Sequence, residues 1–151
     1  MRPQHSRVQQ IERALREARG LRSVNVPLSG WLKALREAMG IPLRAQAAKA
    51  GIRAPTLLIS ERNEASGAIT LNQLRRIGEV MDCELVYALV PRQKLMGRVE
   101  RRAEDVARAE ILGLSHSMAL ENQRPDAAFV RKQIEQRKRQ LLEGNWARLW
   151  R

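Results

Sequence analysis

Hydrophobic residues recur along most of this chain at steps of three and four, the spacing of an amphipathic helix. The first such stripe is Val8, Ile11, Leu15 and Ala18. It lies between arginines and predicts a helix that ends near Gly20, with an apolar face that needs a partner surface. Residues 21–30 lack this periodicity and contain Pro27 and Gly30, so we expect a connector there.

Four short helices are predicted between residues 31 and 81. Glycine suits the position after a helix and proline suits the first turn, and such residues bound the first three helices. They are Gly40, Pro42, Gly51 and Pro55. Thr70 and Gln73 have the spacing of a capping box at the start of the fourth helix. Its stripe is Leu71, Leu74, Ile77, Val80 and Met81.

Residues 83–90, CELVYALV, are rich in β-formers and precede Pro91, so the pattern predicts one short strand. A single strand leaves its backbone N–H and C=O groups unpaired. Symmetric pairing with a second copy of the chain, in a homodimer, is the simpler way to satisfy them. The alternative is that the segment packs irregularly.

Residues 93–121 predict a long helix that stops at Asn122 and Pro125. Its stripe is Val99, Ala103, Val106, Ile111, Leu114 and Met118. A last helix is expected from Asp126 to Glu143. In the tail that follows, Trp146, Leu149 and Trp150 can share a face.

The chain has 151 residues and a net charge of +12, from 28 Lys and Arg against 16 Asp and Glu. This length fits one ordinary core, or a small domain with helical extensions. Basic side chains gathered on one surface bind polyanions by releasing counterions, so nucleic acid is the leading partner. The basic excess is concentrated in residues 1–29 and 92–151.

Few side chains are available for metal or enzyme chemistry. Cys83 is the single cysteine and His5 and His116 are the only histidines, so neither a disulfide nor a structural metal is expected. Cys83 begins an apolar run, which favours packing over reactivity, and no phosphate loop, nucleophile elbow or HExxH motif appears. We expect no catalysis and no cofactor. Without a signal peptide or a membrane-spanning stretch, we expect a cytoplasmic protein.

Two short helices joined by a turn at Gly51 match the architecture of helix-turn-helix DNA readers, although such helix pairs are common. Further residues resemble the repressor-type (Xre/Cro-like) helix-turn-helix, namely LREAMGIP, Ala47, Gly51, Ile52, Glu61 and LNQLRRIGEVMDCEL. Over nearly the full chain, four segments resemble the mobile mystery protein A family. They are GWLKALREAMG, GAITLNQLRRIGEVMDCELVYALVP, HSMALEN and LLEGNWARLW.

This resemblance implies a small helix-turn-helix regulator found next to a partner, mobile mystery protein B, that carries a Fic domain. Fic enzymes typically transfer AMP from ATP to protein hydroxyls. The pair would then be an antitoxin and a toxin, with DNA binding serving autoregulation of the operon.

The base-reading positions depart from the repressor-type pattern, which usually has polar residues there. This chain has Leu43, Ala54, Pro55 and Leu58. These side chains can touch thymine methyls but cannot donate to a base edge. Gln46 and Ser60 also stand where such modules prefer buried apolar side chains. The module is therefore either degraded as a sequence reader or docked in a different register.

Polar side chains near the expected DNA surface are the candidate contacts. They are Arg44, Arg53, Thr56, Arg62 and Asn63. Arg44 and Arg53 lie near helix starts and can meet phosphates, whereas Thr56 and Arg62 are better placed for bases or flanking phosphates. Each arginine could equally serve only to solvate the surface. The same two interpretations apply to the basic N-terminal helix, as a backbone-tracking arm or as a solvated face.

Ser117 and Glu121 lie four residues apart and so share a face of the predicted long helix. Glu121 falls in the last turn, where the helix dipole disfavours a negative charge, although an exposed Glu near a helix end is ordinary. With Asn122 they match the Ser/Thr-x-x-x-Glu-Gly/Asn pattern of the helix that inhibits Fic enzymes. The resemblance implies that Glu121 pairs with an arginine of the Fic motif, where the ATP γ-phosphate would be held.

The sequence therefore predicts a mainly α fold, a repressor-type helix-turn-helix bundle with one short β-strand and a C-terminal helical extension. The expected parts are an N-terminal helix and connector (1–29), a DNA-binding domain (30–91) and a Fic-partner-binding region (92–151). The expected function is an antitoxin-like transcriptional regulator that neutralises a Fic adenylyltransferase. Two alternatives stay open, a plain repressor whose C-terminal helices only dimerise and a sequence-nonspecific nucleic-acid-binding protein.

Overall fold

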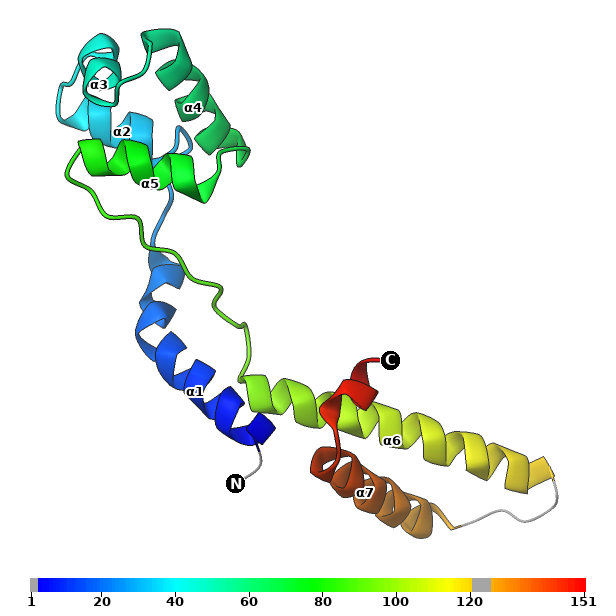
Figure 1. Cartoon of the computed structure of the whole chain (residues 1–151). Coiled ribbons are helices and arrows are strands. Elements are labelled where there is room, and N and C mark those ends of the chain that lie inside the picture. Colours follow the sequence, from blue (N-terminus) through cyan, green and yellow to red (C-terminus); the bar gives the residue numbers. More distant parts are fainter. Residues whose placement is uncertain (1–2, 121–125) are drawn as a thin grey trace. The chain divides into compact units, whose positions relative to one another are not determined.

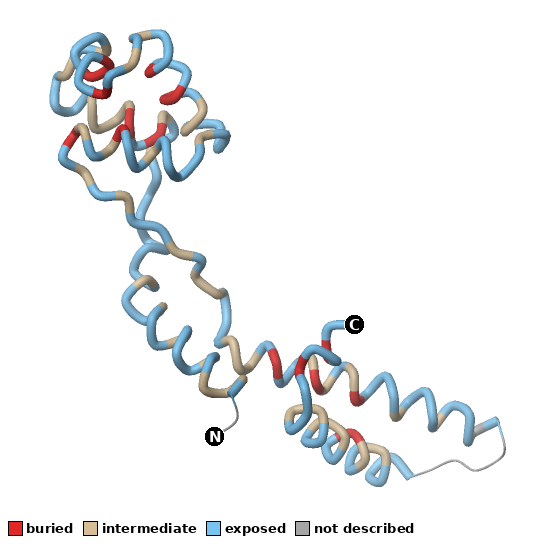
Figure 2. The backbone as a smooth tube through the Cα atoms, viewed as in Figure 1, coloured by how far each residue is buried: buried red, intermediate tan, exposed pale blue. Residues whose placement is uncertain are grey.

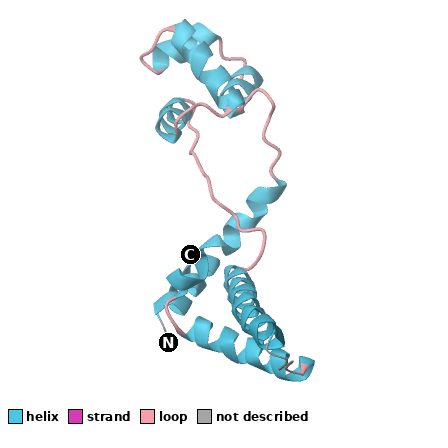
Figure 3. Ribbon diagram, turned by 90° about the vertical axis from the view of Figure 1, so that its right-hand side faces the viewer, coloured by secondary structure: helices cyan, strands magenta, loops and turns pink. Residues whose placement is uncertain are grey.

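The computed structural model describes residues 3–120 and 126–151, and the chain divides into two compact units. The four-helix unit comprises Gly20–Leu89, and the terminal unit comprises Met1–Arg19 together with Val90–Arg151. Both consist of helices and connecting segments, so the predicted mainly α fold is confirmed (Figures 1 and 3). Of the helices within the described ranges, none is both long and apolar enough to traverse a bilayer.

The four-helix unit begins with a 3₁₀ turn that straddles its boundary, Arg19–Ser23, and continues with four α-helices. These are α2 (Trp31–Ala38), α3 (Leu43–Lys49), α4 (Ala54–Ser66) and α5 (Leu71–Val80). Helices this short are marginal in isolation, so their stability comes from packing. Figure 2 shows buried residues on all four helices. The core they form is Leu32, Ala47, Leu57, Ile77 and Met81.

Three of these helices end in the same way. Gly40, Gly51 and Gly67 follow α2, α3 and α4 with φ of 67°, 68° and 81°. In each case the next residue donates its N–H to a carbonyl of the last helical turn, as Ala68 does to Asn63 at 2.7 Å. The stops predicted at Gly40 and Gly51 are therefore confirmed. At the start of α5, Thr70 accepts the N–H of Gln73 at 3.2 Å, which is the threonine half of the predicted capping box.

The predicted strand over residues 83–90 is not seen: this segment is extended but unpaired, and no strand occurs in residues 3–120 or 126–151 (Figure 3). β-Propensity describes how side chains fit a pleated surface, whereas a strand also needs a neighbour for its backbone groups. Within the described chain, no backbone–backbone hydrogen bond joins residues 84–90 to another segment. Val86, Tyr87 and Leu89 are 66%, 63% and 90% exposed, so these three apolar side chains are not buried within one chain.

The terminal unit contains α1 (Pro3–Ala18), α6 (Leu95–Leu120), α7 (Ala127–Glu143) and a final 3₁₀ turn, η2 (Trp146–Trp150). Figure 1 shows α7 running alongside α6. Ala103 and Ala107 on α6 are fully buried, and such small side chains permit close helix packing. The core of the unit is Val99, Ala103, Trp146 and Leu149, with Val8, Met96, Leu141 and Leu142 packed against it.

The first helix is fastened to the start of α6. The Glu12 carboxylate accepts the backbone N–H of Leu95 at 2.8 Å and of Met96 at 3.5 Å. First-turn N–H groups have no partner within their own helix, and a carboxylate there also meets the positive end of the helix dipole. The ring of His5 meets Trp146 edge-on, with centroids 4.8 Å apart. The N-terminal helix therefore shares one compact unit with the C-terminal helices.

Ion pairs join the partly exposed sides of α6 and α7. Glu104 accepts from Lys138 at 3.1 Å and from Arg108 at 3.2 Å, and these hydrogen bonds hold the pKa of its carboxyl below the ordinary value. Glu110 pairs with Arg137 at 2.6 Å. Pairs at this level of exposure add little stability, so their contribution is mainly to the register of the two helices.

Gly30, immediately before α2, occupies a position where a side chain would strain the backbone and displace Glu64. Its φ is +81°, and a Cβ there would lie 2.8 Å from the carboxyl carbon of Glu64. Glu64 needs that space because its carboxylate accepts the N–H groups of Trp31 at 2.7 Å and Leu32 at 2.8 Å. The start of α2 is thus capped by a side chain of α4.

Gly30→Ala should lower the free energy of unfolding by about 2–4 kcal/mol, because it adds backbone strain and displaces the Glu64 cap. Gly67→Ala is the matched control, since Gly67 also has φ of 81° but a Cβ added there would meet nothing within 4 Å. It should show the strain alone, about 1–2 kcal/mol. Denaturant unfolding monitored by circular dichroism would measure both, and equal losses would contradict a role for the cap.

Candidate nucleic-acid interface

Helices α3 and α4 are joined by a tight turn over residues 50–53 and pack against each other through small and buried side chains. Ala47 on α3 is 1% exposed, and Leu57 on α4 is fully buried. Ser60 and Glu61 are buried on the same side of α4 as Leu57. By helical periodicity, Pro55, Ile59 and Arg62 then fall on the opposite, solvent-facing side.

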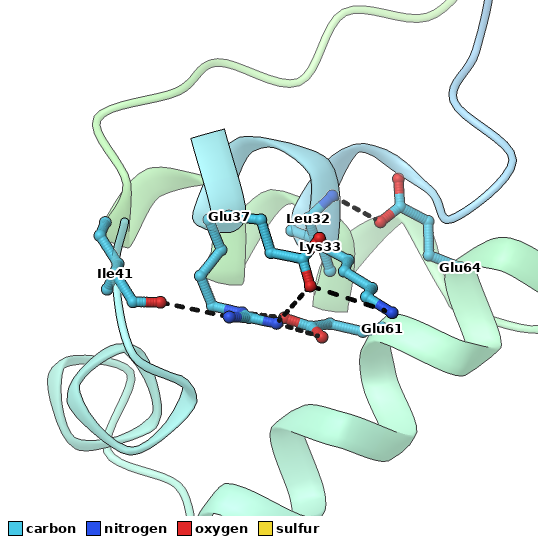
Figure 4. A network of polar contacts seen from close by, with 7 residues as sticks. Leu32, Lys33, Glu37, Ile41, Glu61 and Glu64 are labelled. Carbon is cyan, nitrogen blue, oxygen red and sulfur yellow. Dashed lines mark hydrogen bonds and ion pairs between the residues drawn. The ribbon is translucent and has the colours of Figure 1, made fainter. Parts of the chain in front are cut away.

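A buried ion pair ties α4 to α2. The Glu61 side chain is only 2% exposed. Its carboxylate accepts hydrogen bonds from Nε of Arg36 at 2.6 Å and from Nη2 of Arg36 at 3.1 Å (Figure 4). Arg36 also donates from Nη1 to the carbonyl of Ile41 at 3.2 Å. Its hydrogen bond to Glu61 raises the pKa of Arg36 against the opposing effect of burial. The guanidinium is thereby fixed in one orientation, between α2, the following turn and α4.

The charges of α3 and α4 are sorted by sign. Their two acids, Glu61 and Glu64, face α2, where they hold Arg36 and the first N–H groups of that helix. Three bases on these helices and a fourth at the N-cap of α4 are exposed, and within the described ranges none of them forms an ion pair. These are Arg44, Lys49, Arg53 and Arg62, which we term the α3–α4 basic face. Uncompensated guanidinium and ammonium groups on one helix pair suit phosphate oxygens.

Four of the five predicted contact residues are exposed on this helix pair. Arg44 lies in the first turn of α3, Arg53 at the N-cap of α4 and Thr56 in the first turn of α4, with Arg62 further along. Asn63 is half-buried, and its carbonyl accepts the N–H groups that close the C-terminus of α4. Lys49 was not predicted, and the only signal in the sequence that could have indicated it is a base in the last turn of the short α3.

Only two of the four apolar residues at the expected base-reading positions are exposed. Leu43 and Ala54 are partly buried and pack against the core, so they do not belong to the outer surface. Pro55 is exposed, and Leu58 and Ile59 are 36% and 56% exposed on α4. The outer side of α4 therefore combines apolar groups with the guanidinium of Arg62, and offers few donors for hydrogen bonds to bases.

The two polar residues at expected core positions are both buried. Ser60 satisfies its hydroxyl by donating to the carbonyl of Thr56 at 3.0 Å. Gln46 is 1% exposed, and neither Nε2 nor Oε1 of its amide has a hydrogen-bond partner in the part of the chain that the structure describes. An unsatisfied buried amide costs about 1–3 kcal/mol, so Gln46 weakens the packing of α3.

The second candidate site comprises Ser117, Glu121 and Asn122, and the structure describes only Ser117, in the last turn of α6. Ser117 is exposed and donates to the carbonyl of Gly113 at 3.2 Å. Glu121 and Asn122 lie outside the described residues. Beside Ser117, three large apolar side chains are exposed on α6 and α7 and line a shallow pocket of about 180 Å³. They are Leu114, Met118 and Phe129, which we term the α6–α7 apolar patch.

The chain has no match among known protein-family models, curated proteins or solved structures. Within residues 3–120 and 126–151, no three His, Cys, Asp or Glu side chains come together as metal ligands. Helices α3 and α4 carry exposed bases, and guanidinium and ammonium groups bind phosphate.

Glu61→Ala should cost about 3–5 kcal/mol of unfolding free energy, because it leaves the Arg36 guanidinium buried without its partner. Glu37→Ala is the matched control: Glu37 lies 3.8 Å from Arg36, but its side chain is 56% exposed. Its removal should change stability by less than about 0.5 kcal/mol. Urea titration followed by circular dichroism would measure both variants. Similar effects would show that the buried pair contributes no more than a surface pair.

Proposed function

We propose that this protein is a DNA-binding transcriptional regulator of the cytoplasm, a repressor-type helix-turn-helix protein of the mobile mystery protein A family. The observation that carries the proposal is the sorting of charge on α3 and α4. Both acids are engaged at α2, and the four bases are left exposed and unpaired among the described residues. A turn-linked helix pair with such a surface is suited to a DNA groove and its flanking phosphates.

Binding through this face would depend mostly on phosphate contacts. Arg44, Arg53 and Lys49 would meet the backbone, and Arg62 is the base nearest the outer apolar side of α4. Leu58 and Ile59 could contact thymine methyl groups, which gives less discrimination than bidentate hydrogen bonds. We therefore infer an operator preference that is modest and strongly dependent on salt.

Replacing Arg53 and Arg62 together by Ala should weaken operator binding at least about tenfold at low salt, because two phosphate or base contacts are lost. The slope of log affinity against log salt should fall by about two. Fluorescence anisotropy with DNA from upstream of the gene would measure both quantities. Arg75→Ala with Arg76→Ala removes the same charge from exposed positions of α5 and should have a much smaller effect.

An equal loss in the two double variants would show that the unit attracts DNA by net charge alone, and would count against the α3–α4 basic face. Affinity for random DNA or RNA that equals the affinity for upstream DNA would favour the sequence-nonspecific alternative, since a regulator needs a specificity ratio.

We further propose that residues 117–122, a segment that starts in the last turn of α6, neutralise a Fic-domain partner. Ser117, Glu121 and Asn122 match the sequence pattern of the Fic-inhibitory helix. A carboxylate is a good bidentate partner for an arginine that otherwise binds a phosphate. The α6–α7 apolar patch supports a protein contact beside Ser117, because exposed apolar clusters of this kind often mark binding surfaces.

Glu121→Ala should raise AMP transfer by a co-purified Fic partner at least about tenfold, because a charge-assisted bond contributes about 1.5–3 kcal/mol. Affinity for operator DNA should not change. Glu135→Ala, at an exposed position of α7, is the control and should leave transfer inhibited. Incorporation of labelled phosphate from α-labelled ATP would report transfer, and a Glu121 variant that inhibits as well as the wild type would contradict the proposal.

The α6–α7 apolar patch also favours a second candidate, the plain repressor whose C-terminal helices only dimerise. In that case the patch would be covered by a second copy of the chain, because a homodimer buries the same surface on both copies. Leu114→Glu would then yield a monomer with weakened operator binding and no effect on any Fic enzyme. Sedimentation and AMP transfer measured on this one variant separate the two candidates.

A further inference from the structure

A second concentration of bases lies in the terminal unit, around a pocket of about 590 Å³ near the start of α6. Its charged and aromatic lining consists of Arg92, Arg98, Arg101, Arg102, Asp105 and Trp150. The lining contains four guanidinium groups and one carboxylate, which gives the pocket an excess of three positive charges. The volume is typical of sites for small molecules and is too small for a DNA duplex.

The arginines are placed against the usual preference of a helix. Arg98 precedes Arg101 and Arg102 by three and four residues, so like charges are neighbours on one side of α6. Such pairs destabilise a helix by a few tenths of a kcal/mol each. Within the described ranges, none of the four arginines of the pocket takes part in an ion pair. A cluster of this kind is stabilised when an anion occupies it.

Two of these arginines are held in position by η2. Nε of Arg102 donates to the carbonyl of Leu149 at 2.5 Å, and Leu149 itself is fully buried. The guanidinium of Arg98 lies over the ring of Trp150, 5.8 Å from its centroid. Trp150 nevertheless stays 51% exposed, so much of the indole is open to the pocket or to solvent. Fixed guanidinium groups lose little entropy when they bind an anion.

We propose that this pocket binds a nucleoside phosphate, with its phosphates on the arginines and its base on Trp150. Guanidinium groups match phosphate oxygens in pairs, and several of them offset the three or four charges of a polyphosphate. An indole adds a stacking surface that accepts any base and contributes about 1–3 kcal/mol. The ligand is either a free nucleotide or the end of a single strand, since both present the same groups.

The test is isothermal titration of the full-length protein with ATP, inorganic pyrophosphate and a single-stranded tetranucleotide at low ionic strength. ATP should bind, and pyrophosphate should bind at least about fivefold more weakly because it lacks a base to stack. Arg98→Ala with Arg101→Ala should weaken ATP binding at least about tenfold. The matched control, Arg131→Ala with Arg139→Ala, removes the same charge from exposed positions of α7 and should change it less than about twofold.

Trp150→Leu should abolish the advantage of ATP over pyrophosphate and leave pyrophosphate binding unchanged. Circular dichroism checks that each variant keeps its helices, and the Trp150 variant tests the site without altering an arginine. Tighter binding of ATP than of the tetranucleotide identifies the ligand as a free nucleotide, and the reverse order identifies a strand end.

Absence of binding by both ATP and the tetranucleotide would overturn the proposal, and so would equal losses in the two double-arginine variants. Equal affinities for ATP and pyrophosphate would overturn the assignment of a base site to Trp150. The result does not depend on the proposed regulatory function, because Arg53→Ala with Arg62→Ala should weaken DNA binding while ATP binding stays unchanged. The two hypotheses can therefore fail separately.

Discussion

The arrangement of the four-helix unit depends on two carboxylates of α4, those of Glu61 and Glu64, which point toward α2. Four helices of 7 to 13 residues cannot persist alone, so contacts between them must fix their arrangement. Glu61 holds the guanidinium of Arg36, and Glu64 receives the first N–H groups of α2. A carboxylate only accepts hydrogen bonds, and both acids point toward donors of α2. The bases of α3 and α4 instead face solvent.

The terminal unit uses the same device at a greater distance in sequence. Glu12 accepts the N–H of Leu95 in the first turn of α6, 83 residues away in sequence. Glu64 accepts the N–H of Trp31 at the start of α2, 33 residues away in sequence. In both cases a carboxylate from another helix replaces the local Ser, Thr, Asp or Asn cap that usually begins a helix. A helix start capped in this way receives its cap only when the helix that carries the accepting carboxylate is docked. The capping therefore couples local helix formation to tertiary packing.

Local features were predictable from the sequence, and long-range partners were not. The stops at Gly40 and Gly51 and the cap at Thr70 depend on adjacent residues, and they agree with the structure. Residues 83–90 look like a strand because side-chain preference is local, whereas a ladder needs a partner that periodicity does not reveal. Leu43 was expected at the DNA surface but packs on the core. The sequence of so short a helix does not determine which of its sides faces inward. The arginine pocket was missed since Trp150 reaches Arg98 only after η2 folds back.

The terminal unit is built from segments on either side of the four-helix unit, with the ring of His5 against Trp146 and Glu12 at the start of α6. Synthesis proceeds from the N-terminus, so the contiguous Gly20–Leu89 segment can fold as soon as it is complete. Helix α1 emerges first but has to wait for Trp146 and Leu149 before its apolar face is covered. A polypeptide arrested before α6 would therefore already carry a folded basic face, while its first helix had no core to join.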